Sequence, residues 1–380
     1  MIDYLNNAGA GLMSSSTIEV ITEYLKLESN IGAYHAAAES KSLMQDFYSN
    51  ASKLINANSD SEIAFTDSAS RGWNMVVYGA MLKKGAKIIT LASEFGTNLV
   101  TLFDLAKRIE GTVVVISCDR KGFFSLDEIE TELKDGAALI AISHAVAHGS
   151  IVNPVEKVGV LAKKYGATYI VDGCQAVGQF KVDVQQIQCD AYMTTGRKWL
   201  CGPRGTGFLY VKQSSIFRTT QLDLASADLI INSQSKVTDV EIRKDARQFE
   251  LWERSISNML GLSSAINQCL DKNISEISER IQFLSNKLRN IACSNPKLNL
   301  IGEVESISGI LGFYLEDASQ EEILKEEFRK NDLRISIMSD WDCPLHFPKN
   351  GAKSIFRLSP HYSTSDKTMD IASKIITSFS

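Results

Sequence analysis

The sequence predicts an α/β protein whose sheet is mainly parallel. Two observations predict this class. Short apolar runs rich in Val, Ile and Tyr recur through the first two thirds of the chain, and several are apolar on both faces, as strands inside a parallel sheet are. Stretches with helical periodicity lie between these runs, and strands that alternate with helices form parallel sheets with right-handed crossovers.

The elements follow one another in a regular order. A helix is predicted over residues 70–85, with Gly85 as its stop. Its apolar residues lie on one face at helical spacing: Trp73, Val76, Val77, Ala80 and Met81. The predicted strands are residues 87–92, 112–117, 138–143, 168–173, 191–196 and 205–211. Residues 154–166 form an amphipathic helix with proline in front and glycine behind, and 271–292 is a long helix-prone stretch.

Composition excludes several functional classes. The 380 residues, 44% hydrophobic, suffice for a large core and two domains. With 40 basic and 45 acidic residues the net charge is −5, which gives no electrostatic basis for nucleic-acid binding. The N-terminus lacks the basic and apolar regions of a signal peptide, and no apolar run is long enough to span a membrane, so a cytoplasmic protein without a membrane partner is expected. The seven cysteines are an odd number without a C-x-x-C pair, so neither a disulfide framework nor a metal site is expected.

Ligands of open α/β sheets bind beyond the carboxyl ends of the strands, so the residues that follow each strand are the candidate site. After a strand ending at Phe65, small and hydroxylic residues 66–70 lead directly into a helix. The free N–H groups of that helix start and the serine hydroxyls suit a phosphate. Plain helix capping by Asp67 or Ser68 explains the same residues. Neither nucleotide-binding glycine motif is present.

Two charged residues follow the later strands. Asp172 ends the apolar run TYIVD, and a buried carboxylate needs a cation or hydrogen-bond donors. A turn-capping aspartate would look the same. Lys198 comes after the next strand and directly after Arg197. Taken alone, a lysine in such a loop is most often a solvated surface residue.

Together these loops describe one chemistry. An enzyme that uses pyridoxal phosphate needs a lysine for the Schiff base with the cofactor, an acid that keeps the pyridine nitrogen protonated, and a phosphate cup. Lys198, Asp172 and the loop Ser68–Ser70 would supply them from neighbouring strand ends. Desolvation and a nearby cation such as Arg197 would lower the pKa of the lysine amine and make it nucleophilic.

The chain resembles the class V aminotransferase group of fold type I pyridoxal phosphate enzymes, which includes cysteine desulfurases, C–S lyases and isopenicillin N epimerase-like proteins. The resemblance runs from YLNNAGAG (4–11) to FRLSPHYSTSD (356–366), through YIVDGCQAVGQFKVDV, TTGRKWLCGPRGTGFLYV and ARQFELWE in the family's order. It implies a seven-stranded, mainly parallel sheet in a large cofactor domain of residues 15–255. It also implies a small domain of residues 256–380 joined by 1–14, and a homodimer with active sites at the interface.

The resemblance also implies roles for individual residues. Lys198 matches the Schiff-base lysine, Asp172 the acid at the pyridine nitrogen, and Gln175 the donor to the ring hydroxyl. The positions that match phosphate contacts are Ser68, Ala69, Ser70, Thr195 and Arg197, with Thr206 on a loop that reaches the partner subunit's cofactor.

Four further positions follow from the same resemblance. Phe95 occupies the place of a histidine that stacks on the ring in desulfurases, and a core aromatic is the alternative. Arg357 matches the clamp for the substrate α-carboxylate. Asn7 lies in the segment that folds over the active site. His148 stands near the place of a family asparagine close to the ring hydroxyl, or is a structural histidine.

One departure from the family bears on the reaction. Desulfurases carry a nucleophilic cysteine before the carboxylate-binding arginine, whereas this chain has Cys343 in the setting D-W-D-C-P. The two acids beside it would raise the pKa of its thiol, so a persulfide-forming desulfurase is disfavoured. The best hypothesis is therefore a C–S β-lyase acting on a cysteine-derived substrate, which needs no extra nucleophile.

Other reactions stay open. An aminotransferase of the same fold would move the proton with the same lysine and admit a second amino acid. An epimerase would need a base on the opposite face of the substrate, and the candidates are His148, His144 and Tyr34. A non-catalytic scaffold is the remote alternative, because such a protein would usually have lost the lysine or the acid.

Overall fold

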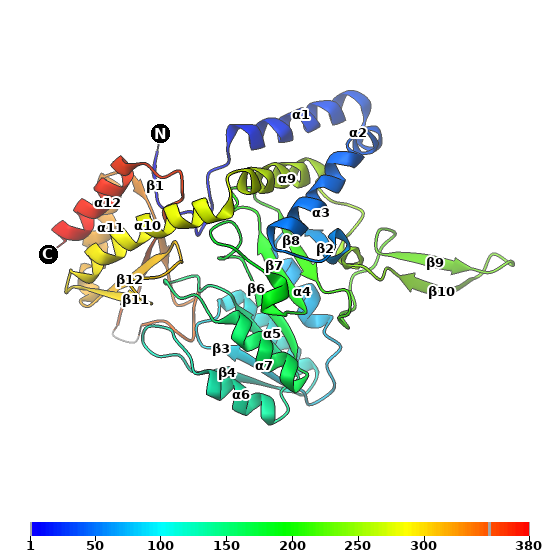
Figure 1. The fold of residues 1–380 in the computed structure, drawn as a ribbon, viewed down its shortest axis with the longest axis horizontal. Coiled ribbons are helices and arrows are strands. Elements are labelled where there is room, and N and C mark those ends of the chain that lie inside the picture. Colours follow the sequence, from blue (N-terminus) through cyan, green and yellow to red (C-terminus); the bar gives the residue numbers. More distant parts are fainter. Residues whose placement is uncertain (1, 349–350, 380) are drawn as a thin grey trace.

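The computed structural model describes residues 2–348 and 351–379, and its centre is a seven-stranded sheet (Figure 1). Along the sheet the strands are β2 (Ile63–Thr66), β8 (Gly207–Val211), β7 (Ala191–Thr195), β6 (Thr168–Asp172), β5 (Leu139–Ser143), β3 (Lys87–Leu91) and β4 (Thr112–Ile116). The strands from β7 to β4 are parallel, and β8 runs antiparallel to both of its neighbours. The predicted α/β class with a mainly parallel sheet is confirmed.

Helices cover both faces of this sheet, which is why its strands are apolar on both sides. Helices α4 (Ala69–Tyr78) and α5 (Gly96–Arg108) pack on one face with Leu139 and Ala141 of β5. Helices α6 (Leu126–Lys134) and α7 (Val155–Tyr165) pack on the other face with Ile140 and Ile142, together with the short α8 (Val184–Ile187). Successive residues of one strand therefore enter two different cores.

The N-terminal segment connects distant parts of the chain. Its strand β1 (Asp3–Tyr4) pairs with β13 (Leu333–Arg334). Three helices follow, α1 (Ser15–Ile31), α2 (Ala33–Glu39) and α3 (Lys41–Leu54), and α1 and α3 pack against α9 (Ile256–Asp271). Helix α9 thus lies beside the large sheet, and the predicted domain boundary at residue 255 stays a prediction.

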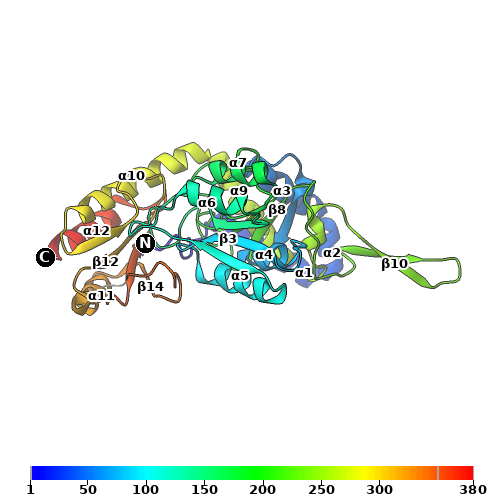
Figure 2. The same cartoon turned by 90° about the horizontal axis from the view of Figure 1, so that it is seen from below.

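A second, four-stranded sheet lies at one end of the molecule (Figures 1 and 2). Its antiparallel strands, in order, are β11 (Leu298–Ile301), β12 (Leu311–Leu315), β15 (Ile355–Leu358) and β14 (Ser336–Met338). Helices α10 (Ile274–Cys293), α11 (Glu321–Lys330) and α12 (Asp366–Ser378) share an apolar core with it. This is the smaller α+β unit that the sequence predicts.

A two-stranded ribbon projects from the opposite end of the molecule (Figures 1 and 2). Its strands are β9 (Ala227–Ile231) and β10 (Val237–Ile242). The ribbon carries large apolar side chains that are at least 40% exposed: Leu229, Ile230, Ile231, Val237 and Val240. Short 3₁₀ turns complete the chain at Asp60–Glu62, Ala246–Phe249 and Ala318–Gln320.

One predicted helix boundary is wrong. The helix expected over residues 70–85 is α4, and it ends at Tyr78. Gly79 caps it, and a Cβ at Gly79 would collide with the carbonyl oxygens of Arg218 and Met75. Met81 then takes a left-handed φ of 49°, so the helical spacing of the apolar residues continues past the true end. The helices predicted at 154–166 and 271–292 are confirmed as α7 and α10. Every helix within residues 2–348 and 351–379 is too short or too polar to cross a membrane.

Candidate active site

A cavity of about 110 Å³ lies at the carboxyl ends of the central strands. Strands β5, β6 and β7 end at Ser143, Asp172 and Thr195, and all three residues line the cavity, as do the starts of α4 and α5. The other lining residues are Ser68, Ala69, Ser70, Phe95, Asn98, Ala145, Ala147, Cys174, Gln175, Arg197 and Lys198. The structure therefore brings most of the predicted site residues together, while their roles stay predictions.

Lys198 follows β7 and is half-buried, unlike a typical surface lysine. Burial is the main reason that the pKa of its amine lies below the ordinary value, and the positive charge of Arg197 lowers that pKa further. Within the described residues the amine has no hydrogen-bond or ion-pair partner. An amine with a lowered pKa and no partner is suited to act as a nucleophile or a base.

Asp172, the last residue of β6, is 8% exposed. Its Oδ2 accepts a hydrogen bond of 2.8 Å from Asn98 Nδ2, and its Oδ1 accepts one of 2.8 Å from the backbone N–H of Cys174. Both oxygens therefore have donors and keep room for another one. The carboxylate is positioned by the fold and is able to hold a protonated ring nitrogen.

The start of α4 combines capping with open donors. Ser68 is the N-cap, and its Oγ accepts a 3.2 Å hydrogen bond from Arg71 N, so the capping alternative is correct for this residue. The N–H groups of Ala69 and Ser70 have no acceptor within the part of the chain that the structure describes. Both residues line the cavity. Open N–H groups at a helix start are the donors that a phosphate requires.

Two predicted phosphate contacts lie on the strand β7 side. Arg197 is half-buried, and its Nη1 donates a hydrogen bond to the carbonyl oxygen of Gly9. Its remaining guanidinium N–H groups stay available for an anion. Thr195 Oγ1 makes a long hydrogen bond of 3.4 Å to Thr206 O. Both side chains line the cavity together with Lys198.

Gln175 and Phe95 occupy other parts of the cavity wall. Gln175 Nε2 donates to Ala8 O at 3.1 Å, and its Oε1 accepts from Trp199 Nε1 at 2.9 Å, so one amide N–H remains for a ligand. Phe95 is half-buried and precedes α5. An aromatic ring in a cavity wall, rather than in the core, is able to stack on a ligand ring.

Four predicted site residues do not line the cavity: Arg357, Asn7, Thr206 and His148. Arg357 on β15 is buried, with Nη1 donating to Ala147 O at 2.9 Å and Nη2 to Ser336 Oγ at 3.2 Å. Its Nε has no partner among the described residues, and burial lowers its pKa to about 10. Asn7 Nδ2 donates to Ser359 O at 2.8 Å, and the Thr206 hydroxyl donates to Pro203 O at 2.6 Å. Arg357 thus abuts the cavity wall with spare donors. Asn7 keeps one amide N–H, whereas the only side-chain donor of Thr206 is engaged.

The candidates for a second base lie outside the cavity lining. His148 Nε2 is 2.9 Å from His346 Nδ1, and His346 Nε2 is 2.9 Å from the carbonyl oxygen of Asp119. Burial lowers the pKa of His148 to about 3 and that of His144 to about 3. His144 Nδ1 lies 2.9 Å from Tyr192 Oη, and Tyr34 on α2 is 79% exposed. Both histidines are thus neutral and bonded to other side chains.

Cys343 lies in an apolar cluster. It is fully buried beside Val146, Ile151, Met338 and Ile355. Burial, followed by the nearby Asp342, raises the pKa of its thiol to about 12. A thiol in this environment stays protonated at neutral pH and is a poor nucleophile.

The strand-end rule also applies to a residue that the sequence reasoning missed. Glu94 lies three residues after the end of β3, whereas Asp172 is the last residue of β6, and Glu94 is 1% exposed. It is joined to Asp172 through Asn98. An acid shortly after the apolar run of residues 87–92 is the sequence signal that points to Glu94.

The chain matches a family of known proteins over most of its length. A family model described as "Aminotransferase class-V" matches residues 3–336. A relative from Methanothermobacter thermautotrophicus, named "Probable cysteine desulfurase", is 25% identical over 376 residues, which cover 97% of this chain and 92% of the relative.

Two solved structures of a protein called C-DES have the same fold. In one, described as a complex of this cystine C–S lyase with its product cysteine persulfide, the TM-score is 0.86 at 18% identity, covering 99% of this chain and 97% of the other. In the other, a mutant with glycine covalently linked to the PLP cofactor, the TM-score is 0.87 at 18% identity, covering 100% and 97%.

Proposed function

The chain belongs to the class-V aminotransferase family, and from that premise we propose that it is a pyridoxal-phosphate-dependent enzyme that cleaves the C–S bond of a cysteine-derived amino acid. The names of the Methanothermobacter relative and of the cystine C–S lyase both concern sulfur-containing amino acids. Lys198 and Asp172 support the binding of pyridoxal phosphate. The surroundings of Cys343 favour a lyase over a desulfurase.

The residues present fit pyridoxal phosphate. The amine of Lys198, which has no partner in the described part of the chain, and the carboxylate of Asp172 line one cavity with the open N–H groups at the start of α4. Pyridoxal phosphate, when bound, supplies an electron sink for the bonds of the substrate's α-carbon. Lys198 would hold its aldehyde carbon, Asp172 its ring nitrogen, and Ala69, Ser70 and Arg197 its phosphate.

The chain's own residues then have separate tasks. Arg357 binds the substrate α-carboxylate with its spare N–H groups. The Lys198 amine takes the proton from the α-carbon, and its lowered pKa leaves more of the free base at neutral pH. The same amine returns a proton to the departing sulfur. Hydrolysis of the remaining fragment by one water molecule then releases ammonia and a keto acid.

The observation that carries the lyase over a desulfurase is the burial of Cys343. A desulfurase needs a thiolate that attacks the substrate sulfur, and the pKa of this thiol is raised to about 12. A β-lyase needs only the lysine. The site therefore supports elimination without a protein-bound persulfide.

The test is an assay of pyruvate and ammonia with a panel of cysteine conjugates and no keto-acid acceptor. We expect both products to form. Turnover that requires an added keto acid would reject the lyase and support an aminotransferase.

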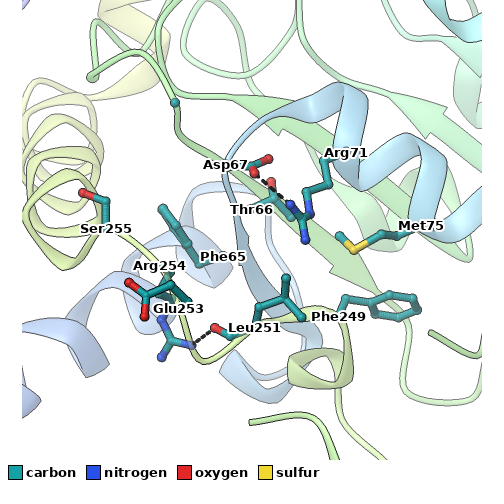
Figure 3. A pocket seen from close by; sticks show the side chains of 11 residues that line it. Phe65, Thr66, Asp67, Arg71, Met75, Phe249, Leu251, Glu253, Arg254 and Ser255 are labelled. Carbon is teal, nitrogen blue, oxygen red and sulfur yellow. Dashed lines mark hydrogen bonds and ion pairs between the residues drawn. The ribbon is translucent and has the colours of Figure 1, made fainter. Parts of the chain in front are cut away.

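We also propose a homodimer with active sites near the interface. The apolar ribbon β9–β10 projects into solvent, and an isolated two-stranded ribbon is marginally stable. A second cavity of about 310 Å³ lies next to the loop before α4, with the Asp67–Arg71 ion pair (3.1 Å) at its wall (Figure 3). Both features suit a partner surface. Light scattering would measure the mass of the dimer.

We also propose the cytoplasmic location that the sequence leads us to expect, and cell fractionation would test it.

A further inference from the structure

A buried carboxylate lies outside the set of residues used so far. Glu94 is 1% exposed and lies between β3 and α5. Its Oε1 accepts hydrogen bonds of 2.9 Å from Phe95 N and from Asn98 Nδ2, and one from Ser143 Oγ. Its Oε2 accepts a 2.7 Å hydrogen bond from Ser143 N. Four donors converge on one side chain, which is the environment of an ionised carboxylate.

The bonds of Glu94 lead to the cavity by two routes. Asn98 Nδ2 bonds Glu94 on one side and Asp172 Oδ2 on the other, at 2.8 Å. A single amide group therefore bridges two buried carboxylates. The second route is the backbone N–H of Phe95, whose ring lines the same cavity.

The network crosses three adjacent strand ends. Glu94 follows β3, Ser143 ends β5 and Asp172 ends β6, and these strands are neighbours in the sheet. Ser143 is itself held, because its carbonyl oxygen accepts a 2.7 Å hydrogen bond from Asn153 Nδ2. A network anchored on three strands fixes side chains more tightly than a loop does.

We propose that Glu94 is a positioning residue that, through Asn98, fixes Asp172, the residue assigned to the cofactor's ring nitrogen. This inference rests on the proposed function. Glu94 aims the Asn98 amide, and that amide holds Asp172 in the orientation that faces the ring nitrogen. When Glu94 is ionised, its negative charge also favours the protonated, cationic form of the bound cofactor.

Titratable groups of the neighbouring strands and loops lie near this pair. Tyr192 on β7 is one of them, and burial raises the pKa of its hydroxyl well above the ordinary value. Burial and the charge of Asp172 raise the pKa of Glu94 to about 7. Lys198, Arg197 and Cys174 line the cavity with Asp172. His144, whose backbone N–H bonds Asp172 O at 2.8 Å, is neutral because burial lowers its pKa to about 3.

The test compares Glu94→Gln, Asn98→Ala and the double variant in the full-length protein. Two quantities are measured: the Kd of pyridoxal phosphate from the quenching of tryptophan fluorescence, and the pH midpoint of the visible absorbance of the bound cofactor. We expect each single variant to raise the Kd about tenfold, the size typical of lost outer-shell contacts. Glu94→Gln moves the midpoint to lower pH, because it removes a charge that stabilises the cationic form.

The double variant and a control variant distinguish a loss of Asp172 positioning from a general loss of protein stability. If Glu94 acts on Asp172 through Asn98, the Kd of the double variant is little above the Kd of Asn98→Ala alone. The control is Thr101→Val on α5, the helix that also carries Asn98. It removes a part-buried 2.6 Å hydrogen bond from Thr101 Oγ1 to Asn74 Oδ1 on α4. It should lower the melting temperature without changing the Kd or the midpoint.

Several outcomes would overturn the inference. One is a Glu94→Gln protein with lowered stability but an unchanged Kd and midpoint. Another is a double variant in which the losses of cofactor-binding free energy simply add. If Glu94→Gln fails to fold, Asn98→Ala decides alone, because Glu94 keeps its donors from Phe95 and Ser143 there, and an unchanged Kd and midpoint would refute the bridge. A wild-type protein that binds no pyridoxal phosphate would overturn the proposed function as well, so the two failures are distinguishable.

Discussion

Two loops of this protein carry a potential nucleophile close to Arg357. One nucleophile lies in polar surroundings and the other in apolar surroundings. The Lys198 loop lines a polar cavity, and its amine has no partner within the described residues. The Cys343 loop packs its thiol among apolar side chains under the small sheet. Burial lowers the pKa of the amine, which favours its reactive form, and raises the pKa of the thiol, which disfavours its reactive form. The surroundings therefore decide which residue reacts.

The largest expected effect is the loss of Lys198. Lys198→Ala removes the base and the attachment point of the cofactor, so the rate should fall by about 10²-fold to 10⁴-fold, the usual share of proton transfer. The visible absorbance of the bound cofactor should disappear as well. The matched control is Lys181→Ala at an exposed position, which should keep both. Retained absorbance in Lys198→Ala would show that Lys198 is not the attachment point of the cofactor.

The next effect concerns the arginine between the two loops. Arg357→Lys keeps the charge but loses the fork that binds a carboxylate with two parallel hydrogen bonds. We expect a loss of about 1.5–3 kcal/mol of substrate binding, seen as a KM raised by about tenfold or more with a smaller change in kcat. Steady-state kinetics measures the split. An unchanged KM would show that the substrate α-carboxylate does not bind to Arg357.

A smaller effect tests the electrostatics around Lys198. Arg197 lowers the pKa of the amine, so Arg197→Gln should raise that pKa. The amine acts as a base only when it is unprotonated, so the acid limb of the pH–rate profile should move to higher pH. The profile is measured at saturating cofactor, because Arg197 also serves the phosphate. A limb that stays in place, or moves to lower pH, would contradict the assignment.

The smallest effect on activity is expected at Cys343. Cys343→Ala removes a buried sulfur atom and leaves a small void, so the free energy of unfolding should fall by about 1 kcal/mol. The kcat should change by less than about twofold, since the thiol takes no part in the reaction. Urea unfolding and pyruvate release measure the two quantities. A large loss of activity with unchanged stability would show that the Cys343 thiol takes part in the reaction.

The sequence predicts the strands well because their apolar runs are continuous and end in distinctive residues. Asp172 and Thr195 fall at strand ends where the sequence predicts them. The helix after Ser68 is predicted too long, because Val76, Val77, Ala80 and Met81 keep helical spacing although Gly79 ends the helix against Arg218. That contact joins residues far apart in the chain, and a local pattern does not contain it.

The site is also predictable only in its strand-end residues, and its long-range contacts are not predictable. Strand-end residues identify Lys198 and Asp172, but they do not show that Glu94 reaches Asp172 through Asn98. Nor does the sequence show that Cys343 points into an apolar cluster, since the local setting D-W-D-C-P is polar. The ribbon β9–β10 was missed because its apolar residues lie outside any core, where alternation with polar residues carries little information.

The most direct test of the comparison is the rate of pyruvate release from a cysteine conjugate by three proteins measured side by side: the wild type, Lys198→Ala and Cys343→Ser, each with pyridoxal phosphate and no keto acid. We predict that the rate of Lys198→Ala falls by about 10²-fold to 10⁴-fold and that Cys343→Ser keeps the wild-type kcat within about twofold. Loss of activity in Cys343→Ser, with its folding intact, would contradict the account and make the buried thiol the nucleophile.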